Sequence, residues 1–287
     1  MRAEDVKRVG VVGCGVMGSG IVEVCARAGL DVVYLEATKE LVEAGRGRIE
    51  ASTLRAVERG KLPEQERDAA LARVSGTTNM ADLADRDLVI EAATEHYETK
   101  REVFRQLDEV TKPGAILASN TSSIPIVDLG AATTRPDKVV GMHFFNPVPV
   151  MGLIEIVRAI TTSEETVEFA RAFGAVLGKS AVLSRDRAGF IVNMLLIPYL
   201  NGAVRMLEER FATREDIDAA VHLGLGHPLG PLQLLDLIGL DTALYVADVL
   251  FEEFKEPLFA PPPLLKRMVT AGLLGRKSGK GFYDYGS

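Results

Sequence analysis

The sequence predicts an α/β domain followed by an all-α domain. A glycine-rich turn lies between an apolar strand pattern and a helix pattern at the start of the chain. Strand and helix patterns then alternate as far as residue 185, and only helix patterns follow. These observations predict a Rossmann-type domain at residues 1–185 and a helical domain at residues 186–287.

The elements of the first domain follow from these patterns. Residues 8–13 are apolar and β-branched, as in a buried parallel strand, and residues 31–36 repeat the pattern after a helix over residues 21–28. Residues 38–73 are charged and alanine-rich, which predicts one long helix and a shorter one. Further strands are predicted at residues 88–91, 115–119, 138–143, 153–157 and 180–183, and further helices at residues 98–110 and 163–177. In the second domain, helices are predicted at residues 190–207, 214–223, 231–254 and 263–271.

The composition excludes several classes of protein. The 287 residues are 47% hydrophobic and 25% charged, unlike a disordered tail, a collagen or a coiled-coil rod. The net charge of −7 argues against a nucleic-acid partner. No apolar run is long enough for a membrane helix, and the polar N-terminus is unlike a signal peptide, so we expect a cytoplasmic protein without a membrane partner. The two cysteines, Cys14 and Cys25, are interpreted as packing residues, and no metal site is predicted.

Residues 13–18 match the motif G-x-G-x-x-G between a strand and a helix. The first glycine permits a tight turn, the second lets the backbone approach a pyrophosphate, and the third lets the helix pack on the strand. The start of the helix presents N–H groups to the phosphates. The predicted cofactor contacts are Gly13, Gly15, Val16, Met17 and Gly18. A purely structural glycine turn is the alternative interpretation.

Glu36, at the end of the second strand, is predicted to set the choice of cofactor. A carboxylate at this place accepts hydrogen bonds from both ribose hydroxyls of NAD and repels a 2′-phosphate. We therefore predict NAD in preference to NADP. The alternative is a surface glutamate that closes the strand.

His143 and Glu155 are the candidate catalytic pair. His143 ends an apolar strand, and Glu155 is the only charge in the apolar residues 152–157. An unpaired buried charge is costly, so a partner is expected for this carboxylate. If the two strands are neighbours, the carboxylate fixes the tautomer of the imidazole and supports a positive charge on it. Such an imidazole can remove a proton from an alcohol while hydride leaves the same carbon. The alternative is that each residue is structural.

Two further polar features are candidate parts of a substrate site. Residues 119–123 form a hydroxyl-rich cluster after an apolar strand, at the sheet edge where α/β proteins bind ligands. A cap of the next turn is the alternative. Asn193 is the lone polar side chain in residues 190–197, and it either faces a cleft or bonds another helix.

Six segments of the chain form a recognisable set in this order: residues 13–20, 118–123, 141–147, 189–193, 230–236 and 279–283. Together they resemble the L-3-hydroxyacyl-CoA dehydrogenase family, which includes the bacterial 3-hydroxybutyryl-CoA dehydrogenases. The resemblance covers essentially the whole chain. It implies an NAD-binding domain, a helical domain that carries a homodimer interface, and an acyl-CoA substrate held between the two. The implied reaction is the reversible oxidation of the 3-hydroxyl group to a ketone.

The resemblance also implies roles for individual residues. His143 matches the base, Glu155 its orienting carboxylate, and Ser122 and Asn193 the groups that hold the substrate oxygen. The residues implied around the nicotinamide half are Glu95, Lys100, Ser122, Asn146 and Lys277. Ser52 and Arg59 match positions that contact CoA. The chain departs from the family in two places, since many members have lysine at position 59 and most have aspartate at position 36.

Three alternatives stay open at this point. The first is a dehydrogenase of small polyols or sugar acids of the gulonate dehydrogenase type, which needs no CoA. The second is a 3-hydroxyacyl thioester carried on acyl carrier protein. The third is a non-catalytic NAD-binding protein, which the intact His–Glu pair opposes. Acyl-chain length and physiological direction do not follow from the sequence, and the homodimer follows from the resemblance alone.

Overall fold

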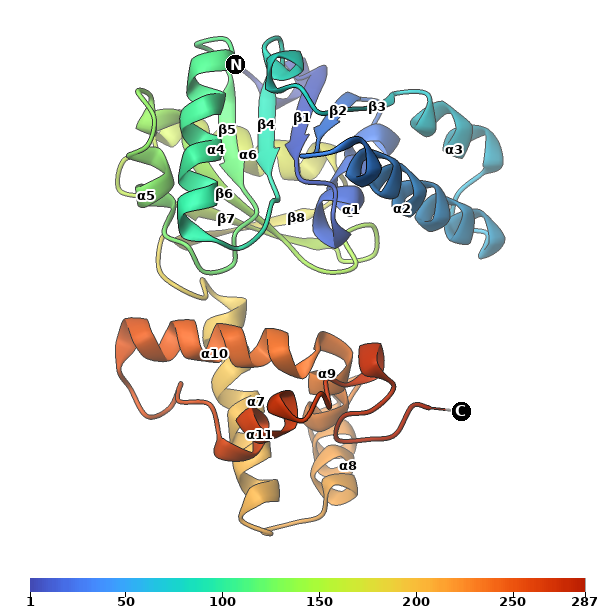
Figure 1. Ribbon diagram of the computed structural model, residues 1–287, viewed down its shortest axis with the longest axis vertical. Helices are drawn as coiled ribbons and strands as arrows, with labels where there is room; N and C mark the ends of the chain where they lie inside the picture. Colours follow the sequence, from blue (N-terminus) through green and yellow to red (C-terminus); the bar gives the residue numbers. More distant parts are fainter. Residues whose placement is uncertain (287) are drawn as a thin grey trace. The chain divides into compact units, whose positions relative to one another are not determined.

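The computed structural model describes residues 1–286, which divide into two compact units, residues 1–187 and 188–286 (Figure 1). The first unit is an α/β unit and the second is helical, so the predicted fold class is confirmed. No helix among these residues is long and apolar enough to cross a membrane. No group of histidine, cysteine, aspartate and glutamate side chains in the described chain is arranged to hold a metal ion.

The first unit is built on one eight-stranded sheet in the order β3-β2-β1-β4-β5-β6-β7-β8. Every neighbouring pair is parallel except β6–β7, which is antiparallel. The order from β3 to β6 is that of a dinucleotide-binding sheet. The strands are β1 (Arg8–Val12), β2 (Asp31–Leu35), β3 (Val74–Thr77), β4 (Leu88–Glu91), β5 (Ile116–Ser119), β6 (Val139–Phe144), β7 (Leu153–Arg158) and β8 (Ser180–Arg185).

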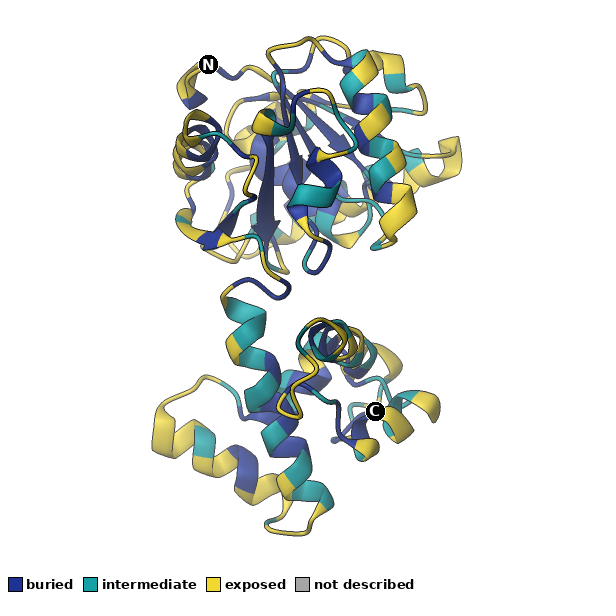
Figure 2. Ribbon diagram, turned by 90° about the vertical axis from the view of Figure 1, so that its left-hand side faces the viewer, coloured by how far each residue is buried: buried dark blue, intermediate teal, exposed yellow. Residues whose placement is uncertain are grey.

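Helices cover both faces of this sheet, and its central strands β1, β4, β5 and β6 are largely buried, whereas the edge strand β8 is largely exposed (Figure 2). Several follow an N-cap residue whose side chain accepts a hydrogen bond from a backbone N–H of the first turn, such as Thr38 before α2 and Ser163 before α6. The helices of this unit are α1 (Val16–Arg27), α2 (Lys39–Glu58), α3 (Glu64–Leu71), α4 (Tyr97–Val110), α5 (Ile126–Gly130) and α6 (Glu164–Val176).

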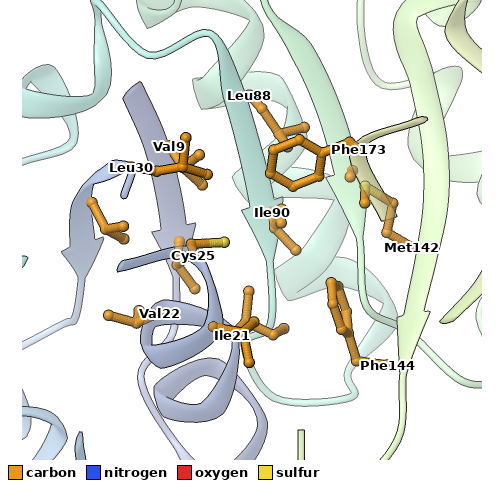
Figure 3. Close-up of a cluster of buried hydrophobic side chains, with 14 of the residues drawn as sticks. Val9, Ile21, Val22, Cys25, Leu30, Leu88, Ile90, Met142, Phe144 and Phe173 are labelled. Atoms are coloured by element: carbon orange, nitrogen blue, oxygen red, sulfur yellow. The ribbon is translucent and has the colours of Figure 1, made fainter. Parts of the chain in front are cut away.

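The core of the first unit lies between the sheet and helices α1 and α6 (Figure 3). Ile21 and Cys25 of α1 pack with the strand residues Val9 and Ile90, and Phe173 of α6 belongs to the same cluster. All five side chains are fully buried. This packing fixes the edge of the sheet from which the candidate site residues extend.

The second unit contains five helices and its own cores in the part that the structure describes. Asp218 accepts hydrogen bonds from the N–H groups of Leu232 and Gln233 and so caps α9. Asp236 accepts from the N–H groups of Phe282 and Tyr283 and holds the C-terminal segment. The helices are α7 (Val192–Glu208), α8 (Arg214–Leu225), α9 (Pro231–Ile238), α10 (Leu240–Phe254) and α11 (Pro263–Thr270).

The structure corrects the sequence prediction at three elements. Strand β3 was not predicted, because its four residues include a serine and a glycine and so lack an apolar pattern. Helix α5 is only five residues long and was also not predicted. The single helix predicted over residues 231–254 is two helices, because Gly239 between them has a φ of 99° and cannot continue a helix.

Candidate functional site

The glycine loop between β1 and α1 has two closed positions and one open position. A Cβ atom at Gly13 would lie 2.8 Å from the backbone of Ala92, and one at Gly18 would lie 1.8 Å from the carbonyl oxygen of Gly13. A Cβ atom at Gly15 would meet nothing within 4 Å. Helix α1 begins directly after Gly15, at the exposed Val16. The loop therefore has room for a phosphate group at Gly15, next to the N–H groups at the start of the helix.

Glu36 lies against this loop, directly after β2. Its Oε1 atom accepts a hydrogen bond of 2.5 Å from the backbone N–H of Cys14. No other residue of the described chain donates to the carboxylate, which is half-buried. It is thus placed to accept hydrogen bonds from the hydroxyl groups of an adenosine ribose. The loop, the start of the helix and Glu36 together fit NAD.

The two cysteines are buried and are not nucleophiles at neutral pH. Burial raises the pKa of Cys14 to about 12, and the neighbouring Glu36 carboxylate acts in the same direction. Burial also raises the pKa of Cys25 to about 12. Both thiols are free and pack in the core, as the sequence predicts.

His143 and Glu155 lie directly opposite each other on the antiparallel strands β6 and β7. The Nδ1 atom of His143 is 2.7 Å from Oε2 of Glu155. Glu155 is fully buried and His143 is 7% exposed. Because a carboxylate only accepts hydrogen bonds, Nδ1 carries a proton, so in the neutral imidazole the lone pair is on Nε2. The tilted ring of Phe145 packs 4.7 Å from the imidazole, centroid to centroid.

A second buried charge network lies at the end of β4. The Nζ atom of Lys100, on α4, donates to Oε1 of Glu91 at 2.6 Å, and both side chains are almost completely buried. Oε2 of Glu91 accepts from the hydroxyl group of Ser119 on β5. Lys100 also lies 3.2 Å from Oε2 of Glu95. One ammonium group therefore serves two carboxylates.

Glu95 connects this network to the hydroxyl-rich segment after β5. Its Oε1 atom accepts from the hydroxyl groups of Thr121 and Ser123 and from the backbone N–H of Ser122. Burial raises the pKa of Glu95, but the Lys100 ammonium group and these hydrogen bonds outweigh it, and the pKa is lowered overall. The carboxylate thus stays charged and fixes the backbone from which the Ser122 side chain extends.

Sequence reasoning assigned no individual role to two residues that hold this site together. Glu91 is the only charged residue in its strand, so the argument applied to Glu155 also predicts a buried partner for it. Asn120 follows β5, and its Oδ1 atom accepts a 2.9 Å hydrogen bond from the N–H of Phe144. This bond ties the hydroxyl-rich segment to the residue after His143.

Other predicted residues are not joined to these groups by the contacts within each unit. Asn146 is exposed in the loop after β6, and Ser52 and Arg59 lie on and just after α2 with no side-chain hydrogen bond to any described residue. Asn193 and Lys277 belong to the second unit, where Lys277 forms an ion pair of 2.5 Å with Asp241. A cavity of about 580 Å³ beside the end of α1 is lined by none of the predicted site residues.

Comparisons with known proteins find one enzyme family over both units of the chain. Residues 8–187 match the family described as 3-hydroxyacyl-CoA dehydrogenase, NAD binding domain. Residues 189–285 match the C-terminal domain of the same enzyme. A 3-hydroxybutyryl-CoA dehydrogenase of Mycobacterium tuberculosis is 56% identical over 285 residues, which cover 99% of this chain and 100% of that protein.

Solved structures show the same similarity. The crystal structure of FadB2 from M. tuberculosis has a TM-score of 0.96 at 56% identity and covers 98% of this chain and 99% of that one. The crystal structure of an (S)-3-hydroxybutyryl-CoA dehydrogenase from Ralstonia eutropha has a TM-score of 0.94 at 44% identity. It covers 99% of this chain and 100% of that chain.

Proposed function

The chain belongs to the 3-hydroxyacyl-CoA dehydrogenase family, an NAD-dependent enzyme class, and on that premise we propose that it interconverts (S)-3-hydroxybutyryl-CoA and acetoacetyl-CoA. The observation that carries this proposal is the 2.7 Å hydrogen bond between His143 and the buried Glu155. The pair supplies a base of fixed tautomer, which the oxidation of an alcohol requires.

In the proposed mechanism, His143 moves the proton. Its Nε2 atom removes the proton of the 3-hydroxyl group as the ketone forms, and returns a proton when the ketone is reduced. Glu155 stabilises the imidazolium ion through the hydrogen bond to Nδ1. When bound, NAD supplies the acceptor of the hydride that leaves carbon 3. The loop at Gly15, the start of α1 and Glu36 hold that cofactor.

The substrate oxygen is held, in this proposal, by Ser122 and Asn193. Glu95 accepts a hydrogen bond from the backbone N–H of Ser122 and so fixes the backbone that positions the Ser122 hydroxyl group. Alanine at either position is expected to raise the KM for acetoacetyl-CoA and lower kcat, because a hydrogen bond to the developing charge is lost. The Kd of NADH, measured by fluorescence titration, should not change in the Asn193 variant, because only Ser122 of the two is also expected near the nicotinamide.

We further propose family-like roles for the residues outside the network. Ser52 and Arg59 would contact CoA, and Asn146 and Lys277 would lie near the nicotinamide. Lys277 would do so while paired with Asp241, so it would act as a partly neutralised cation. Charge reversal at Arg59 should raise the KM for acyl-CoA and leave the KM for NADH unchanged.

The substrate is tested by the loss of NADH absorbance with acetoacetyl-CoA and with longer 3-ketoacyl-CoA thioesters. We expect turnover of acetoacetyl-CoA, and little turnover of free acetoacetate or of acetoacetyl-acyl carrier protein. Preferred turnover of the free acid would replace this proposal with a small hydroxy-acid dehydrogenase. NADPH should be a poor substitute, and equal kcat/KM for NADH and NADPH would remove Glu36 from cofactor choice.

We also propose that the enzyme is a homodimer that associates through its helical unit and acts in the cytoplasm. Sedimentation equilibrium should give twice the chain mass of 31.0 kDa. A monomeric mass at micromolar concentration would contradict the dimer. Fractionation of cells that make the protein would test its location.

A further inference from the structure

Arg48 binds the glycine loop from the side of helix α2. Its Nη1 atom donates to the carbonyl oxygen of Cys14 at 3.3 Å, while Glu36 accepts from the N–H of the same residue. Gly45, one turn earlier, packs so closely that a Cβ atom there would lie 2.8 Å from Cys14. The backbone of Cys14 therefore contacts two opposite charges, the Glu36 carboxylate at its N–H group and the Arg48 guanidinium at its carbonyl oxygen.

The guanidinium group of Arg48 is otherwise uncommitted. Arg48 is exposed and forms no ion pair with any residue that the structure describes. Arg46, two residues earlier, shows the contrast, because it pairs with Glu50 and also donates to two backbone carbonyls. Arg48 therefore presents most of its N–H groups to solvent beside the loop and Glu36.

This juxtaposition bears on the choice between NAD and NADP. In dinucleotide-binding sheets a carboxylate after the second strand selects NAD, and a nearby arginine accommodates the 2′-phosphate of NADP. In this chain a carboxylate (Glu36) and an arginine (Arg48) both form hydrogen bonds to the backbone of Cys14. We propose that Arg48 is a latent 2′-phosphate-binding residue, and that the charge of Glu36 alone keeps the site selective for NAD. The proposal rests on NAD binding and not on the acyl substrate.

The test is calorimetric binding of 2′,5′-ADP and 5′-ADP, which requires no catalysis. Glu36→Gln removes the charge but keeps an oxygen for the N–H of Cys14. We expect its preference for 2′,5′-ADP over 5′-ADP to rise about tenfold or more over that of the wild type, because a charged guanidinium–phosphate bond is no longer opposed. The gain should shrink as salt is added.

The second substitution identifies the cation. Glu36→Gln with Arg48→Ala should lose the gain, whereas Glu36→Gln with Arg55→Ala should keep it. Arg55 is the matched control, since it is also exposed, lies seven residues later on α2, and forms no side-chain hydrogen bond or ion pair with any described residue.

Three results would overturn the proposal. The first is that Glu36→Gln does not raise the preference for 2′,5′-ADP over 5′-ADP. The second is that the raised preference persists when Arg48→Ala is added, and the third is that adding Arg55→Ala removes it equally. Glu36→Ser is a second charge-free variant in case glutamine lowers the melting temperature. Because the probes carry no acyl group, failure here leaves the proposed dehydrogenase activity untouched, and absence of that activity leaves this binding test valid.

Discussion

His143 and Glu155 are direct partners in the register of the antiparallel pair β6–β7, and their side chains meet at 2.7 Å. Directly opposite residues of an antiparallel pair share one face of the sheet, so their side chains are neighbours. The backbone therefore sets the geometry of the pair. Reversal of the chain between β6 and β7 creates this contact, because it returns Glu155 to the end of the strand that carries His143.

Replacement of His143 by glutamine should remove the base and leave the fold intact. We expect kcat to fall by roughly two to four orders of magnitude, the range that general acid–base catalysis contributes. The Kd of NADH should stay within a factor of about two, since no cofactor contact is changed. Stopped-flow kinetics and fluorescence titration measure the two quantities. His222→Gln, on α8, is the control, and a His143→Gln enzyme of near-native turnover would exclude His143 as the base.

Alanine at two glycines of the loop should separate folding from cofactor binding. Gly18→Ala places a Cβ atom 1.8 Å from a backbone oxygen, so the melting temperature should fall sharply. Gly15→Ala places it in open space, so stability should be unchanged. If a pyrophosphate occupies that space, the Kd of NAD should nevertheless rise about tenfold or more in Gly15→Ala. Normal NAD affinity in this variant would show that the cofactor does not approach Gly15.

The buried pair of Glu91 and Lys100 should show strong energetic coupling. Lys100→Met leaves the buried Glu91 carboxylate without its ammonium partner, which should cost about 3 kcal/mol or more of unfolding free energy. Adding Glu91→Gln removes the uncompensated charge and should restore part of that loss. Urea denaturation of the two single variants and the double variant measures the coupling. If the loss of unfolding free energy in the double variant equals the sum of the losses in the two single variants, the coupling is absent and the prediction is wrong.

Acid should destabilise the protein partly through Glu95. The pKa of Glu95 in the folded protein lies below its ordinary value of 4.5. The folded state therefore binds this proton less readily than the unfolded state. The resulting stability is present above about pH 4.5 and is lost as the pH falls through the lowered pKa. In Glu95→Gln, the unfolding free energy should change less between pH 6 and pH 3 than in the wild type. An unchanged pH profile would indicate that Glu95 is not held in its charged form.

Local sequence was sufficient for most of the fold, and it singled out most residues of the candidate site. The glycine spacing, the apolar strand patterns and the lone charge of Glu155 act over a few residues, so they can be identified without knowing which strands are neighbours. The same reasoning applied to Glu91 predicts a buried partner, but it does not say which one. It also failed where a strand has only four mixed residues, as in β3, and where one glycine divides a helix pattern, as at Gly239.

Tertiary structure alone decided the pairings. Lys100 with Glu91, Asn120 with the N–H of Phe144, and Arg48 with Cys14 join residues that are 9, 24 and 34 positions apart. Such contacts depend on the order of strands in the sheet and on how each helix packs against it. A charge in the sequence shows that a partner is needed, because burial without one is costly. Which partner it receives is determined only when the strands are placed side by side.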